Sequence, residues 1–303
     1  MDIICAGAVT VDTIAVLDRT PGPDERVLAE GFLVAGGGPA ATAAVAAARL
    51  GASVGFCGVV GDDEDGRLSR ELLAAEGVDT RWLEVRPGVT TTRSMILVSR
   101  TDGTRTIVTT ESAAPARVPT GESRWLHVDQ TGFAAARTAL RGSGGGARLS
   151  VDGGNPVPGL DLSLVDLYAP ARSALAAAFP AADVAGSMRA ASEAGAGDVV
   201  VTAGAEGSFL WLDGAARHMP GVEPPEMVST MGAGDVFHGA LLAALAGGRT
   251  LPDAAQWANA AAALSCRAVD GRSGIPDAAT TTAYLASRRT AALPLGTARK
   301  DDS

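Results

Sequence analysis

The segment 229–235, Ser-Thr-Met-Gly-Ala-Gly-Asp, carries the residues whose types and spacing point most directly to chemistry. Gly232, Ala233 and Gly234 stand just before an apolar helical pattern, so their backbone N–H groups can converge where a helix begins. The helix dipole adds positive potential there, which suits the negative charge on a phosphoryl group in transfer. Asp235 falls in the first turn, where its carboxylate could accept a proton from an attacking hydroxyl. The alternative is that Asp235 only caps the helix.

A second glycine-rich segment, 36–41, is similar to the dinucleotide-binding pattern G-x-G-x-x-[GA]. That pattern needs a strand directly before it and an acidic residue at the end of the following strand. The following strand ends at Cys57 and Gly58, and the first acid, Asp62, lies in a turn beyond it. A dinucleotide site is therefore disfavoured. Two interpretations remain: tight packing of a helix start against a sheet, or a helix N-terminus that faces a polar ligand.

These segments belong to a chain that alternates between short apolar runs and helical patterns. The alternation predicts an α/β fold with a mostly parallel central sheet and helices on both faces. The expected strands are 3–7, 53–60, 125–128, 148–151, 164–168, 183–185, 199–202 and 208–212. The expected helices lie within 36–51, starting at Pro39, and at 67–76, 133–141, 171–178, 234–246 and 251–268.

Two stretches, 14–34 and 90–110, break the alternation with short β patterns. Segments 91–98 and 105–110 flank the dipeptide Asp102-Gly103, which favours a hairpin turn. We expect the two stretches to form a small β-sheet lid over the strand ends, where open α/β sheets bind ligands. Residues 1–13, 35–89 and 111–290 would form the α/β core. Residues 291–303 lack periodicity, and we expect a disordered tail.

Lysine is nearly absent from the sequence: of 25 lysine and arginine residues, only Lys300 is a lysine. This excludes Schiff-base and pyridoxal phosphate chemistry in the body of the chain, and also the lysine-containing phosphate loop. It equally excludes a protein kinase, which needs a lysine on a strand. The net charge of −9, without a basic block, argues against nucleic acid or an anionic membrane as the main partner.

The remaining composition points to a cytoplasmic protein. Cys5, Cys57 and Cys266 are isolated, which is typical of reduced thiols. The N-terminus is not a secretory signal, and no apolar run of about 20 residues could span a bilayer. The histidines lie too far apart to predict a structural metal site: His127, His218 and His238.

Taken together, these features resemble the ribokinase-like (PfkB) family of sugar kinases over nearly the whole chain. The family's C-terminal signature is Asp-Thr-x-Gly-Ala-Gly-Asp-x-Phe-x-Gly, and residues 229–239 match it at all but the first position. Its N-terminal signature is matched by Gly37-Gly38 and by the Ala-Arg-Leu-Gly helix end at 48–51. Gly61-Asp62, the expected hairpin and segment 199–210 follow in the family's order.

The resemblance implies that Asp235 is the base that deprotonates a sugar hydroxyl for in-line attack on the γ-phosphate of ATP. Gly232, Ala233 and Gly234 would form the anion hole, a mechanism of positioning and electrostatics that needs no lysine. Asp12, at the end of the first strand, would hold sugar hydroxyls, since a carboxylate can accept two hydrogen bonds. The other implied site residues are Gly37, Gly38 and Thr42 for the sugar, and Thr202, Gly204, Gly207 and Asn259 for the nucleotide.

The sequence departs from the family pattern mainly where cations are handled. Thr42 stands where most members have an asparagine in the sugar site, and Pro39 where ribokinase has a lysine. Ser229 replaces an aspartate that helps to hold a monovalent cation, which puts that cation in doubt. The family's Asn-x-x-Glu motif, linked to magnesium, is missing from segment 169–174. Mg²⁺ would then arrive mainly with the nucleotide, and the sequence assigns no protein metal ligand.

We therefore expect an ATP- and Mg²⁺-dependent kinase for a primary hydroxyl of a small sugar or sugar derivative. The resemblance also implies a homodimer through the β-sheet lid. One alternative is a non-catalytic sugar- or nucleotide-binding regulator, favoured by Ser229 and the missing motif and opposed by the intact Asp235. Another is a nucleoside kinase, disfavoured because aromatic base stackers are scarce. Segments 36–41 and 235–239 also resemble members that act on sulfofructose, but the sequence does not identify the sugar or the hydroxyl.

Overall fold

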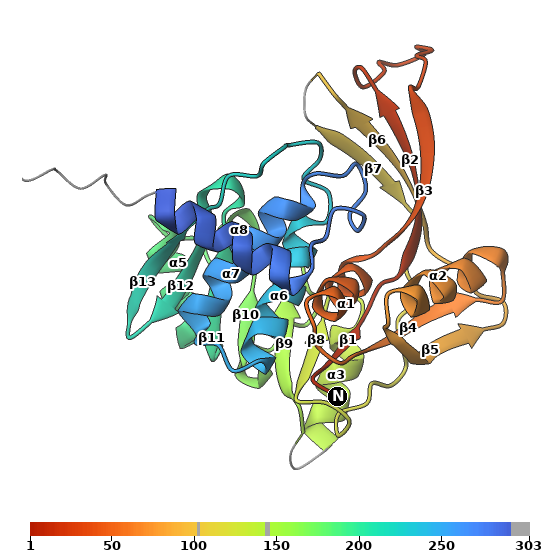
Figure 1. The fold of residues 1–303 in the computed structure, drawn as a ribbon. Coiled ribbons are helices and arrows are strands. Elements are labelled where there is room, and N and C mark those ends of the chain that lie inside the picture. The colour runs from red at the N-terminus through yellow and green to blue at the C-terminus, as the bar shows by residue number, and fades with distance from the viewer. Residues whose placement is uncertain (102–103, 143–145, 292–303) are drawn as a thin grey trace, which may run out of the picture.

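A large central sheet organises the chain, for which the computed structural model describes residues 1–101, 104–142 and 146–291. In these ranges, sheet A contains nine strands in the order β13-β12-β11-β10-β9-β8-β1-β4-β5 (Figure 1). The seven strands from β11 to β5 in this order are parallel to one another, and β12 pairs antiparallel with both β11 and β13. The strands are β1 (Ile3–Ala6), β4 (Val54–Gly61), β5 (Asp79–Arg86), β8 (Trp125–Val128), β9 (Arg148–Asp152), β10 (Leu167–Ala169), β11 (Asp198–Thr202), β12 (Gly207–Leu212) and β13 (Ala215–Pro220).

Helices cover both faces of sheet A, which confirms the predicted α/β architecture. Alternate residues of β1 enter different cores: Ile3 packs with α1, α2, α6 and α7, and Ile4 packs with α3, α4 and α5. The helices are α1 (Pro39–Arg49), α2 (Glu64–Ala75), α3 (Phe133–Gly142), α4 (Arg172–Ala178), α5 (Val184–Glu193), α6 (Ala233–Ala246), α7 (Leu251–Ser265) and α8 (Ala278–Ala291), with short 3₁₀ turns at Leu162–Leu164 and Gly204–Glu206. No helix in the described ranges is long and apolar enough to cross a membrane.

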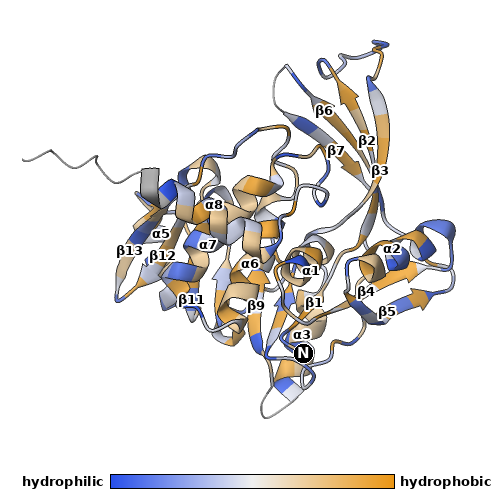
Figure 2. Ribbon diagram, in the orientation of Figure 1, coloured by the Kyte–Doolittle hydropathy of each residue, from blue (hydrophilic) through white to orange (hydrophobic). Residues whose placement is uncertain are grey.

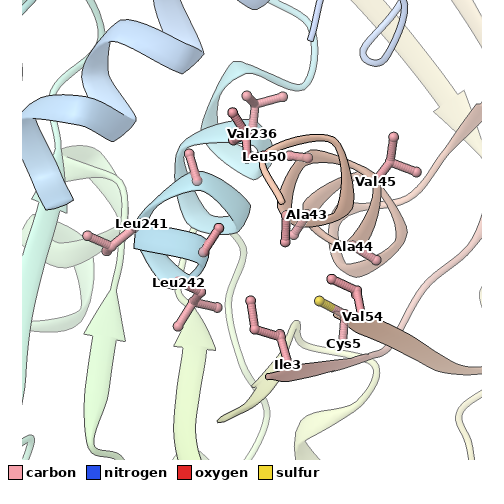
Figure 3. Close-up of a cluster of buried hydrophobic side chains, with 14 of the residues drawn as sticks. Ile3, Cys5, Ala43, Ala44, Val45, Leu50, Val54, Val236, Leu241 and Leu242 are labelled. Atoms are coloured by element: carbon pink, nitrogen blue, oxygen red, sulfur yellow. The ribbon is translucent and has the colours of Figure 1, made fainter. Parts of the chain in front are cut away.

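The abundance of alanine and glycine is explained where α1 and α6 meet. The alanines of α1 are buried, and a side chain at Gly239 of α6 would overlap the carbonyl of Ala43. Figure 3 shows the two helices in contact above β1, with Val236 and Ala43 facing a common core. Because the backbones approach this closely, the first turns of α1 and α6 lie over the same edge of sheet A.

A second sheet, sheet B, stands apart from the core at the top right of Figure 1. Its strand order is β3-β2-β6-β7, and β2 and β6 are parallel whereas the outer pairs are antiparallel. The strands are β2 (Thr10–Leu17), β3 (Gly31–Gly37), β6 (Arg93–Ser99) and β7 (Arg105–Thr109). The predicted hairpin is confirmed as β6 and β7, although its turn at 102–103, like the tail from 292 onward, lies outside the described residues.

Several elements differ from the sequence prediction. Asp183 does not begin a strand: its carboxylate accepts a hydrogen bond from the N–H of Gly186 and caps α5. The three-residue segment 183–185 was too short to distinguish a strand from a helix start. Asp12 does not end the first strand of the core but lies within β2 of sheet B. Strands β5 and β13 and helix α8 were not anticipated.

Candidate active site

The amino end of α6 brings the Gly-Ala-Gly segment and Asp235 together. Gly232 precedes the helix with a φ of 72°, and a side chain there would approach the backbone of Gly271 to 2.9 Å. Only glycine meets both constraints. Ala233 and Gly234 then begin the helix, where N–H groups have no intrahelical partner. The N-cap residue, Gly232, makes no side-chain cap bond, and Asp235 is the acidic residue of the first turn.

The surroundings of Asp235 raise the pKa of its carboxyl group to about 7. The main cause is burial, and the next is the negative charge of Asp152 close by. A carboxylate with a pKa near neutrality can accept a proton at pH 7 and release it again. This is the property that a general base requires.

Asp12 lies buried on β2, beside the glycines that lead into α1. The hydroxyl of Thr10 donates a 2.7 Å hydrogen bond to its carboxylate. Gly37 passes so close that a side chain there would overlap the Asp12 carboxylate. Gly38, with a φ of 91°, then turns the chain into α1. Burial raises the pKa of Asp12, and the hydrogen bonds of Thr10 and Ser94 oppose that rise.

Arg272, which the sequence analysis did not single out, occupies the same region. It comes from the loop after α7, and it is 7% exposed. Its Nη2 donates to the carbonyl of Gly37 at 2.6 Å, and its Nε donates to Thr42 Oγ1 at 3.3 Å. Its charge also acts on the carboxylates of Asp12 and Asp235. Burial lowers the pKa of Arg272 to about 10, so it remains a cation at neutral pH.

Asp129 follows β8 and was also missed by the sequence analysis. Its buried carboxylate accepts backbone hydrogen bonds from Ala8 and Ala40, at 2.8 and 3.3 Å, and from Thr131 and Gly132, at 2.8 and 3.1 Å. Burial raises the pKa of Asp129 to about 6. These bonds join the loop after β1 to the first turn of α1, so Asp129 helps to fix the glycine-rich segment.

Asp235 also belongs to a cluster of three titratable side chains, together with Asp152 and His238. Asp152 ends β9, and His238 follows Asp235 by about one turn of α6. The three side chains each present one potential ligand atom, and these atoms lie within 4.8 Å of one another. Among the residues that the structure describes, this is the group that could hold a metal ion.

The four residues expected to bind a nucleotide line one cavity of about 560 Å³. Thr202, Gly204 and Gly207 form its wall at the end of β11, and the cavity also contains Ala233 and Gly234. The fourth, Asn259 of α7, donates from Nδ2 to the carbonyls of Met219 and Pro220, at 3.1 and 3.2 Å. Asn259 therefore holds a wall of the cavity by bonding to the end of β13.

A larger cavity, of about 860 Å³, lies between the loop after β9 and helix α4. It contains none of the predicted site residues, and its lining is mostly small or apolar. The smaller cavity is the better candidate because it brings the predicted nucleotide residues to the anion-hole segment. Asp12, Gly37 and Thr42 do not line this cavity and lie near Arg272 instead.

The sequence analysis missed three residues of the site: Asp129, Asp152 and Arg272. The sequence pattern could have identified the two aspartates but not the arginine. Asp129 and Asp152 stand at or just after the ends of apolar parallel strands, where ligand-facing polar residues are expected. That signal was present and could have identified both. Arg272 lies in an irregular loop, and no spacing connects it with Gly37 or Thr42.

Comparison with known proteins shows to which family the chain belongs. Residues 1–139 and 159–278 match the family described as pfkB family carbohydrate kinase. The chain is 26% identical to the ribokinase of Haemophilus influenzae over 92% of its own length and 96% of that protein. It is 32% identical to a fructokinase of Klebsiella pneumoniae, over 77% of its length and 82% of that protein.

Solved structures show the same fold. The ribokinase of Thermotoga maritima has a TM-score of 0.82 at 23% identity and covers 94% of this chain and 99% of its own. The Arabidopsis thaliana ribokinase complexed with ribose and ATP has a TM-score of 0.81 at 21% identity, covering 94% of this chain and 98% of its own. With a family match over most of its length and a ribokinase fold, the chain belongs to the pfkB family of carbohydrate kinases.

Proposed function

We propose that this kinase transfers the γ-phosphate of ATP to a hydroxyl of a small sugar or sugar derivative. Asp235 acts as the base, and Gly232, Ala233 and Gly234 supply the anion hole. The supporting observation is the position of Asp235. Asp235 directly follows Ala233 and Gly234, which line the nucleotide cavity. The positive charge of Arg272 acts both on the Asp235 carboxylate and on the Asp12 carboxylate.

The proposed step has a simple balance of atoms. The sugar hydroxyl oxygen attacks the γ-phosphorus, the bond from that phosphorus to ADP breaks, and the hydroxyl proton passes to Asp235. Asp12 holds other hydroxyls of the sugar, while the amino end of α6 stabilises the charge on the phosphoryl oxygens. Arg272 and Thr42 fix the Gly37 backbone against which the sugar lies.

Magnesium does not fit the place that the family pattern gives it in this chain. Segment 169–174, where the Asn-x-x-Glu motif is expected, contains neither asparagine nor glutamate, so the oxygen atoms of that motif are missing. Mg²⁺ prefers oxygen ligands and retains several waters. We therefore propose that it enters bound to the ATP phosphates, and no step is assigned to a protein-bound Mg²⁺.

Ser229 also makes a poor monovalent-cation ligand. Its hydroxyl oxygen accepts a 3.1 Å hydrogen bond from the N–H of Met231, and it carries no charge. Activation by potassium is accordingly expected to be weak, which a potassium titration of the kinase assay measures.

We propose that sheet B is the lid of the site and that it also forms the contact between the two chains of a homodimer. Phe32, Val34, Met95 and Val108 are exposed, and their pairing registers put them on one face of the four strands. In Figure 2 the strands of sheet B carry orange, hydrophobic segments, although this sheet stands away from the core. Exposed apolar area of this kind favours association. Phe32→Asp combined with Met95→Asp should convert a dimer to a monomer in light scattering, and a wild-type monomer would contradict the proposal.

The cysteines fit a cytoplasmic location. Cys5, Cys57 and Cys266 are all buried and free of disulfides, as expected of a protein from a reducing compartment.

The decisive experiment is ADP release with Mg²⁺ and ATP over a panel of sugars, sugar acids, sulfosugars and nucleosides. Asp235→Asn should lower kcat by about 10²–10⁴-fold with the preferred substrate, because the base is removed while the shape is kept. Asp213→Asn, at an exposed turn between β12 and β13, is a control for substitution of an aspartate outside the site.

The outcome also separates the alternatives. Sugar binding by calorimetry without turnover of any substrate would favour a regulator. Turnover confined to nucleosides would favour a nucleoside kinase. Full activity in Asp235→Asn would eliminate the assigned base.

A further inference from the structure

The group beneath Asp235 is built from two elements far apart in the sequence. Asp152 is the last residue of β9, and His238 and Asp235 lie on the first two turns of α6. The Nδ1 atom of His238 lies 3.4 Å from an Asp152 carboxylate oxygen. Asp235 completes a set of one imidazole and two carboxylates whose ligand atoms lie within 4.8 Å of one another.

His238 is enclosed without satisfying its polar atoms. It is 4% exposed, as is Asp152, and in the described structure no hydrogen bond of good geometry reaches either ring nitrogen, although the Asp152 carboxylate and the backbone of Ala169 both act on the imidazole. Leaving buried polar atoms unpaired costs on the order of 1–3 kcal/mol each, so such an arrangement calls for a partner. His127 does not supply one: its ring centroid is 5.7 Å away, and its own Nδ1 is bonded to Ser150 Oγ at 3.1 Å.

The separation of the atoms agrees better with two ligands of one ion than with a direct bond. A charge-assisted N–H···O bond is about 2.7–2.9 Å long, shorter than the 3.4 Å between His238 and Asp152. In tetrahedral zinc sites, bonds of about 2.0–2.1 Å put neighbouring ligand atoms roughly 3.3 Å apart. A metal ion would displace the proton of the imidazole, and the two carboxylates would then balance the charge of a dication.

We propose that Asp152, His238 and Asp235 form a binding site for a transition-metal dication of the zinc class. Three protein ligands leave a fourth position for water. The imidazole disfavours Mg²⁺, which prefers oxygen ligands in octahedral geometry, and favours zinc and its neighbours in the transition series. This site is therefore distinct from the magnesium that accompanies ATP.

The expected consequence is inhibition, and this part rests on the proposed function. A metal ion bound to one carboxylate oxygen of Asp235 withdraws electron density and makes the carboxylate a weaker base for the sugar proton. The kinase would then be silenced when zinc binds and restored when a chelator removes it.

The site is tested by direct metal binding, independently of any kinase assay. The full-length protein, freed of metal with a chelator, is titrated with Zn²⁺ by calorimetry and with Co²⁺ by visible absorption. We expect one ion per chain and cobalt bands of tetrahedral intensity. His238→Gln and Asp152→Asn should each weaken binding at least about tenfold. His218→Gln, on the exposed strand β13, should leave binding unchanged and controls for surface histidines.

Thermal melts establish that each variant is folded before titration, and either of the two substitutions suffices for the test. Absence of stoichiometric binding, or equal binding by wild type and folded His238→Gln, would overturn the proposal. Displacement of Co²⁺ by millimolar Mg²⁺ would overturn the assignment to the zinc class. If zinc binds but no substrate is phosphorylated, the proposed function fails while the metal site stands. If the enzyme turns over and zinc does not bind, the reverse holds.

Discussion

The proposed nucleotide side and the proposed sugar side of the candidate site differ in the kinds of residue that form them. The proposed nucleotide side is rich in glycine and alanine, with Gly204, Gly207, Ala233 and Gly234 around its cavity, beside a few larger residues such as Phe237. The proposed sugar side is built around the buried Arg272, which donates to the Gly37 carbonyl and the Thr42 hydroxyl and whose charge acts on Asp12. A surface of backbone depends on the course of the chain, so it tolerates change in nearby side chains. A surface of charged side chains depends on each residue, and differences in substrate should arise there.

The largest expected effect tests whether the nucleotide side depends on backbone alone. Gly232→Ala would force a positive φ on alanine and press its methyl group against Gly271, displacing the anion hole. We expect a fall of about 10²–10³-fold in kcat, the range typical of a lost oxyanion donor. Steady-state kinetics with the preferred sugar measure it.

The matched control is Gly248→Ala, at a φ of 84° after α6, where a methyl group would meet nothing within 4 Å. It imposes a similar backbone strain away from the site, so it should lower the melting temperature but leave kcat unchanged. Equal kcat for Gly232→Ala and wild type would show that the shape of this turn does not matter to catalysis.

A smaller effect should come from one side chain on the sugar side. Asp12→Asn removes the charge that holds sugar hydroxyls, and hydrogen bonds to a charged group contribute about 1.5–3 kcal/mol. This corresponds to a rise of roughly 10–100-fold in KM for the sugar, with KM for ATP unchanged. Asp18→Asn, an exposed residue that follows β2, is the control. A parallel rise in both KM values would indicate that Asp12 acts on the whole site rather than on the sugar.

The smallest expected effect is a change in the pH dependence of catalysis, which is set by Asp235. Asp235 must be ionised to accept a proton, and its pKa is raised to about 7 by burial and by the charge of Asp152. In enzyme freed of transition metals, kcat/KM should therefore fall below pH 7, approaching about tenfold per pH unit. Asp152→Asn removes the neighbouring negative charge and should move this fall to lower pH. A profile that stays flat down to pH 5 would contradict the role of Asp235.

The fold was largely predictable because its signals are local, whereas the nucleotide residues were expected only from the resemblance to the family. Strand and helix periodicity, Pro39 at a helix start and the turn at Gly232 each depend on residues adjacent in sequence. The expectation that four nucleotide residues share a site agrees with the cavity that they line. Their roles, like that of Asp235, remain predictions until the kinetics are measured.

The sugar side was less predictable because it is assembled from distant segments. Arg272 reaches Gly37 and Thr42 across more than 200 residues, and no periodicity marks such a contact. The histidine spacing gave no indication of a metal site, since His238 meets an aspartate of β9 rather than another histidine. The placement of Asp12 at the end of the first strand was wrong because the chain enters sheet B only three residues after β1.

The position of Asp12 within β2 has a mechanical consequence. Sheet B is not merely a cover, since the carboxylate proposed to hold the sugar is built into one of its own strands. Any rotation of sheet B against sheet A therefore carries that carboxylate toward or away from Asp235, which belongs to the core. The Arg272 hydrogen bond to the Gly37 carbonyl ties the end of β3, and with it the base of sheet B, to the loop after α7. A displacement of sheet B and a displacement of the Asp12 carboxylate are therefore one and the same movement.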